Sequence, residues 1–173
     1  MAPQETSDLV QVLENGRSAF NAVAGGVSEA QAERNPAEGR WSVLQCVEHV
    51  TIVEERFLGF LESAGRLESP AVDGSKEARL YEQVTNRSGR AEAPDVVRPT
   101  GRFASLADAL AGFNAVRART ILFAAERTAE LPALACEHRR FGPVNGREML
   151  MIIAGHAVRH AAQIGEVRAQ IGA

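Results

Sequence analysis

Histidine is the residue type whose positions say most about possible chemistry in this sequence. The chain has four histidines, and two of them, His156 and His160, are separated by four residues. On a helix this spacing places both side chains on one face, about 5–6 Å apart at Cβ. The same face carries Ile153 and Val167, so it is predicted to be buried. Because a buried imidazole without a hydrogen-bond partner costs about 1–3 kcal/mol, two in one buried face require an explanation.

A third histidine, His49, offers an explanation for the two buried histidines, His156 and His160. It lies at the edge of an apolar stripe on an earlier predicted helix, beside Cys46 and Val53. If that helix packs beside the one bearing His156 and His160, three neutral imidazoles meet and can bind a divalent ion with open coordination positions. This donor set suits Zn, Ni, Mn or Fe. Each histidine alone is more commonly an ordinary core residue, but the three together favour a metal site.

Four further residues have both a functional and a structural interpretation. Gln163, one turn after His160, is either a contact to a ligand or substrate or an ordinary core amide, and the sequence favours neither. Cys46 is interpreted as a small buried core residue rather than as a metal ligand. Arg139 and Arg140 precede the last predicted helix, where they could meet an anionic substrate, but a solvated loop is the favoured interpretation.

Three more polar residues are predicted to take no part in the site. His138 is assigned to a loop. Glu48 and Arg159 directly precede the candidate ligands His49 and His160. Because successive residues of a helix point to different sides, both are predicted to be solvated. The sequence therefore shows no clear catalytic acid or base beside the three histidines.

The elements that must position these residues are predicted to be helices. Apolar residues recur every three or four positions along four segments of the chain. The first segment carries its apolar stripe from Leu9 to Val27. The second begins at Ser42, where Gln45 completes a capping box, and ends near Gly65.

The third and fourth helices have equally clear starts. The third is predicted to begin at Ser105 and to end at Leu131. The fourth begins at Asn145, a capping residue with Glu148 three positions later, and runs to about Ile171.

The connection between the second and third helices is long and irregular. Proline and glycine interrupt residues 66–104, which are predicted to contain one short helix around residues 76–87. No strand pattern is found anywhere in the chain. The predicted fold is all-α, a four-helix bundle with a long crossover between the second and third helices.

Length, composition and charge exclude several classes of protein. The 173 residues, 45% of them hydrophobic and 24% charged, suit one globular domain, predicted over residues 1–173. The formal net charge of −3 argues against a nucleic-acid partner. Cys46 and Cys136 cannot build a disulfide framework, which suits a reducing compartment. The basic residues are 18 arginines and one lysine, which with the many alanines indicates a GC-rich, bacterial genome.

No membrane partner is expected. Apolar runs fall short of the roughly 18–20 residues that cross a bilayer. The first residues lack the basic and apolar pattern of a secretory signal. We therefore expect a cytoplasmic protein.

Two segments resemble a known family. RWSVLQCVEHV and GREMLMIIAGHAVRHAAQIGEVRAQIG are similar to the DinB-like (YfiT-like) four-helix-bundle metalloproteins. The matching elements are a Trp-Ser helix start, a histidine about seven residues later, and a late His-x-x-x-His followed by Gln-Ile: Trp41, Ser42, His49, His156, His160, Gln163 and Ile164. The loop HRRFGPVNG also resembles the one before the family's last helix. The resemblance covers the whole chain in architecture and about 40 residues in motif.

The resemblance implies a function as well as a fold. It makes His49, His156 and His160 the metal ligands. The family includes S-transferases that use low-molecular-weight thiols such as bacillithiol, mycothiol or glutathione, and related isomerases. We therefore expect a metal-dependent enzyme that activates a thiol or water against a small-molecule substrate: a thiol S-transferase or a related isomerase or hydrolase. The resemblance also implies a possible homodimer.

Two alternatives stay open. The first is a non-catalytic bundle that binds a metal or small ligand, or serves as an interaction module. The second is a purely structural bundle with three histidines in its core. The missing acid or base suits metal-activated thiol transfer slightly better than hydrolysis.

Overall fold

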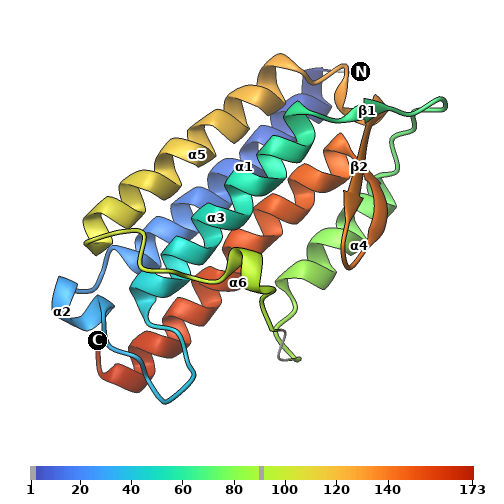
Figure 1. Ribbon diagram of the computed structural model, residues 1–173. Coiled ribbons are helices and arrows are strands. Elements are labelled where there is room, and N and C mark those ends of the chain that lie inside the picture. Colours follow the sequence, from blue (N-terminus) through green and yellow to red (C-terminus); the bar gives the residue numbers. More distant parts are fainter. Residues whose placement is uncertain (1–2, 90–91) are drawn as a thin grey trace.

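The computed structural model describes residues 3–89 and 92–173. Four long helices run side by side along the molecule: α1 (Pro3–Ala24), α3 (Val43–Glu62), α5 (Leu106–Glu126) and α6 (Gly146–Ile171) (Figure 1). Around the bundle α1 packs against α5 and α6, and α3 packs against the same two helices. The predicted four-helix bundle is therefore confirmed, and α3 and α6 are neighbours.

The predicted helix starts are confirmed in atomic detail. The Ser42 side chain accepts a hydrogen bond from the Gln45 backbone N–H, and the Gln45 side chain accepts one from the Ser42 N–H. Asn145 and Glu148 form the same reciprocal pair at the start of α6. These capping boxes satisfy backbone donors that a helix start would leave unpaired.

The long crossover between α3 and α5 is also confirmed. It contains the short helix α4 (Gly74–Thr85), which packs on the outside of α6, and a single 3-10 turn, η1 (Asp95–Val97). Two further short elements, α2 (Glu29–Ala32) and η2 (Leu131–Ala133), lie in other connections. After η1 the crossover passes over α6 and α3 on its way to the start of α5 (Figure 1).

The structure corrects the prediction that the chain has no strands. Strands β1 (Gly65–Arg66), β2 (Leu134–His138) and β3 (Gly142–Asn145) form a small antiparallel sheet in the order β1-β2-β3. The sheet lies at the end of the bundle opposite α2 (Figure 1). Such short strands give no alternating pattern long enough to detect in the sequence.

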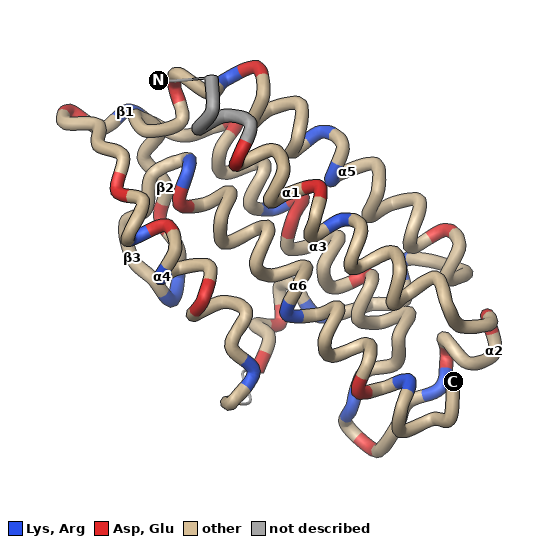
Figure 2. The backbone as a smooth tube through the Cα atoms, turned by 180° about the vertical axis from the view of Figure 1, so that it is seen from behind, with Lys and Arg blue, Asp and Glu red and all other residues tan. Residues whose placement is uncertain are grey.

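Two buried ion pairs join helices within the bundle. Arg117 of α5 and Glu54 of α3 meet at 2.7 Å with side chains 0% and 2% exposed. Arg147 of α6 and Glu77 of α4 form a similar buried pair. By contrast, α6 carries no Asp, Glu, Lys or Arg from Met149 to Val158, a stretch drawn in tan in Figure 2. None of the helices within the described residues is long and apolar enough to cross a membrane.

Candidate metal centre

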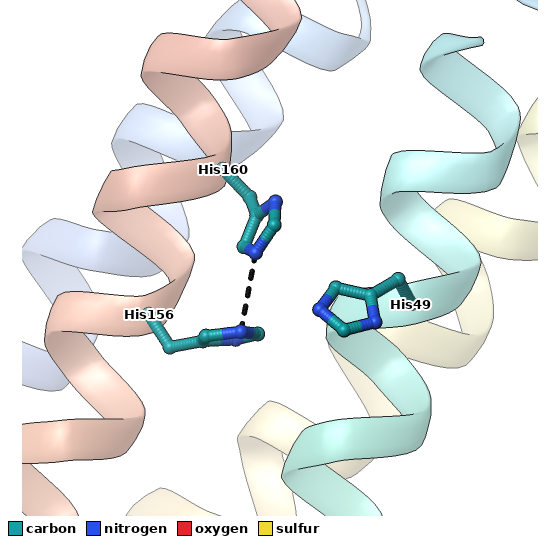
Figure 3. Close-up of side chains that lie close together, drawn as sticks. All are labelled: His49, His156 and His160. Carbon is teal, nitrogen blue, oxygen red and sulfur yellow. Dashed lines mark hydrogen bonds between the residues drawn. The ribbon is translucent and has the colours of Figure 1, made fainter. Parts of the chain in front are cut away.

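The three predicted ligands meet between α3 and α6. His49 lies in the second turn of α3, and His156 and His160 lie one turn apart in α6. The rings point toward one another across the space between the two helices (Figure 3). One nitrogen from each histidine lies within 4.8 Å of the others. The structure thus brings together the three residues that the sequence singled out, while their role as metal ligands stays a prediction.

The orientation of His49 is set by a backbone carbonyl. Its Nδ1 lies 2.7 Å from the carbonyl oxygen of Val97, the last residue of η1. A carbonyl only accepts hydrogen bonds, so Nδ1 must carry the proton and donate it. This tautomer leaves a lone pair on Nε2, the nitrogen that faces the two α6 histidines (Figure 3). Trp41 packs on the same ring, with centroids 4.7 Å apart.

The facing Nε2 atoms of the two α6 histidines are better suited to binding a metal ion than to a hydrogen bond with each other. Their Nε2 atoms are 3.1 Å apart, so in the metal-free protein one ring must donate to the other. Within the described residues, the buried Nδ1 of His160 has no hydrogen-bond partner. A cation between the rings would accept both Nε2 lone pairs, so neither ring would have to act as a donor there. The donor chemistry therefore fits a divalent ion.

Burial keeps all three rings neutral. It is the largest cause of the lowered pKa of each histidine, and the pKa values of His156 and His160 fall well below the usual 6.5. The positive charge of Arg159 lowers both of these further. The Val97 carbonyl acts in the opposite direction on His49. Neutral imidazole is the form that binds metal, so the cluster is ready for an ion at neutral pH.

Of the remaining site candidates, Gln163 lies at the cluster, whereas Cys46, Arg139 and Arg140 are placed as the structural interpretation predicted. Gln163 is half-buried beside His160 and raises the pKa of that ring, so it contacts the cluster from the predicted position. Cys46 is fully buried in the core, and burial raises the pKa of its thiol to about 12, which agrees with a structural role. Arg139 and Arg140 are exposed in the hairpin, as predicted.

Three predictions about polar residues are wrong. His138 ends strand β2 and packs against the rings of Phe57 and Phe141, and it does not lie in a loop. Arg159 is half-buried and donates to the carbonyl oxygen of Asn86, just after α4. Glu48 is only 1% exposed. Arg159 and Glu48 are covered by parts of the crossover, which helical periodicity cannot reveal because the covering residues are far away in sequence.

Sequence reasoning also missed two groups that contact the cluster. The Val97 carbonyl belongs to an irregular segment, and a backbone atom gives no signal in a sequence. Trp41 precedes the Ser42 cap, and the sequence does not indicate that its ring reaches His49. Both contacts depend on how segments far apart in the chain fold together.

Fold and site together define a helical-bundle protein with a buried three-histidine centre. The DinB superfamily model matches residues 13–164, and the chain belongs to this superfamily. Among solved structures the chain is similar to YfiT from Bacillus subtilis, described as a probable metal-dependent hydrolase with an unusual four-helix bundle topology. That match has a TM-score of 0.63 at 18% sequence identity and covers 99% of this chain and 90% of the other. A comparison with curated proteins gives no significant match.

Proposed function

We propose that the chain is a metal-dependent enzyme in which His49, His156 and His160 bind one divalent ion. The observation that carries the proposal is the convergence of three neutral imidazoles on one point between two rigid helices. Within residues 3–89 and 92–173, no acidic or cysteine side chain joins this group of possible ligands. When bound, the ion supplies Lewis-acid chemistry, because its undiminished double charge makes a thiol or water molecule beside it more acidic.

The residues of the chain supply orientation, access and electrostatics. His49 and His160 are buried, whereas His156 is partly exposed, so we expect the side of His156 to be the one from which a small molecule approaches. Arg159 and Arg87 lie close enough to lower the pKa of His160. The Glu166 carboxylate pairs with Arg87, so the attraction falls to Arg159, which donates to backbone carbonyls. The positive charge of Arg159 favours a substrate or thiol that carries an anionic group near the site.

Thiol transfer is the leading reaction, and hydrolysis is the second candidate. Among the described residues, no carboxylate joins the cluster as a possible general base for water. The adjacent Glu48 is engaged with backbone N–H groups of the crossover. A thiol needs less help, because its own pKa is far closer to neutrality than that of water. Hydrolysis is kept as the second candidate because of the fold similarity to YfiT.

Two measurements test the proposal. Elemental analysis of purified protein should find about one divalent ion per chain, and His156→Ala should lose it. A screen of small electrophiles with bacillithiol, mycothiol and glutathione, run beside hydrolysis of esters and amides without thiol, then separates transfer from hydrolysis. Bound metal with no turnover in either arm would favour the non-catalytic alternative, and no bound metal would overturn the proposal.

A further inference from the structure

We propose that Glu48 is a positioning residue that orients His49 through residues 97–102 of the crossover. The inference deepens the proposed function and rests on it, because it concerns how one ligand of the metal centre is held. Glu48 and His49 are consecutive in α3, yet both bind the same distant segment of the chain. The segment is therefore attached to the helix at two adjacent positions.

The first attachment is a buried carboxylate. The Glu48 carboxylate accepts hydrogen bonds from the backbone N–H groups of Thr100 at 2.7 Å, Gly101 at 3.2 Å and Arg102 at 3.1 Å. The Thr100 hydroxyl adds a fourth, longer contact at 3.3 Å. Three donors converge on two oxygens that are almost completely shielded from water, which makes charge-assisted bonds of this kind strong.

The second attachment sets the chemistry of His49. A neutral imidazole can carry its proton on either nitrogen, and the hydrogen bond made by one nitrogen decides which lone pair is left for a metal. Here the Val97 carbonyl, only three residues before Thr100, accepts a hydrogen bond from the Nδ1–H of His49. The Glu48 carboxylate thus fixes the stretch that carries this carbonyl.

The glutamate at position 48 is needed for its charge as well as its shape. Glutamine has the same length, but its NH₂ group would face backbone donors and leave at least one of them unpaired. The segment should nevertheless stay attached loosely, because Arg102 also binds Glu55 through two side-chain contacts of 2.6 and 2.8 Å. We therefore expect Glu48→Gln to fold but to release Val97 from His49 for part of the time.

Nuclear magnetic resonance of the full-length, metal-free protein tests this directly. Long-range ¹H–¹⁵N correlations report which nitrogen of His49 carries the proton. The wild type should show the Nδ1–H tautomer, and Glu48→Gln should show a mixture with Nε2–H. Zinc affinity, measured by competition with a chelator, should fall about 10–100-fold, the range seen when groups that orient a metal ligand are removed.

Glu77→Gln is the matched control. Glu77 is also a buried carboxylate, but it accepts hydrogen bonds from the Arg147 side chain, between α4 and α6, and not from the backbone of the crossover. This variant should leave the His49 tautomer unchanged even if it lowers the melting temperature. Gly101→Ala perturbs the segment while leaving every side chain of α3 unchanged. Gly101 has φ +81°, which disfavours alanine, although no atom lies within 4 Å of the added methyl group. It should change the tautomer in the same direction as Glu48→Gln.

The outcomes are distinct. An unchanged tautomer in both Glu48→Gln and Gly101→Ala would overturn the positioning role, and so would a change of equal size in Glu77→Gln. If Glu48→Gln does not fold, Gly101→Ala alone decides the question. A wild type that binds no zinc but shows the expected tautomers would overturn the metal function while supporting the structural link.

Discussion

Acid should destabilise the metal-free protein through the histidines of its cluster. In the unfolded chain each histidine takes up a proton near pH 6.5. In the folded protein, burial holds the pKa values of His156 and His160 well below that. The folded-state pKa lies below the unfolded one, so the stabilisation is fully present above pH 6.5 and is lost as the pH falls from there toward the folded-state pKa.

The size of the effect follows from proton linkage. Between pH 6.5 and 5.5 the unfolded form gains about 1 kcal/mol for each histidine that stays neutral in the folded form. His156 and His160 together give about 2 kcal/mol. For a chain of this length that corresponds to a fall in melting temperature of about 4–8 °C.

Urea denaturation and thermal melts in chelator at pH 7.5, 6.5 and 5.5 measure this loss. The double variant His156→Gln, His160→Gln should lose about 2 kcal/mol less than the wild type over the same pH step. Saturating zinc at about 100 times its Kd should add about 2.7 kcal/mol at pH 7.5. Equal pH dependence in wild type and double variant would refute the argument that these rings are buried and neutral.

Three further outcomes follow from particular contacts. His156→Ala should weaken metal binding more than about tenfold in isothermal titration calorimetry because one of three ligands is lost, whereas His138→Ala, in the hairpin, should bind as the wild type does. Ser42→Ala should lower the free energy of unfolding by about 0.5–2 kcal/mol through loss of the α3 cap but leave metal affinity unchanged, and an unaltered melting temperature would contradict the cap. Glu54→Ala should lower the free energy of unfolding, measured in urea, by about 3–5 kcal/mol because it leaves Arg117 buried without its carboxylate. Glu130→Ala, which removes solvent-accessible ion pairs with Arg66 and Arg127, should lower it by less than about 1 kcal/mol.

Local signals explain the part of the fold that could be predicted. The starts of α3 and α6 depend on side chains within three residues of each cap, so Ser42 and Asn145 are recognisable without any tertiary information. The spacing of His156 and His160 places them on one helical face for the same reason. Their meeting with His49 required one further assumption, that their helices are neighbours, and the structure bears it out.

Local sequence patterns were thus enough to predict the four helices, the long crossover and, once the helices that carry them are taken as neighbours, the cluster of His49, His156 and His160. Tertiary packing set the path of the crossover, which buries Glu48 and brings the Val97 carbonyl to His49. It also decided the small sheet and the pairing of Arg117 with Glu54, 63 positions apart. The physical reason is the range of the interactions: capping and helical periodicity act within one or two turns, whereas the burial of a charge depends on partners that folding alone brings together.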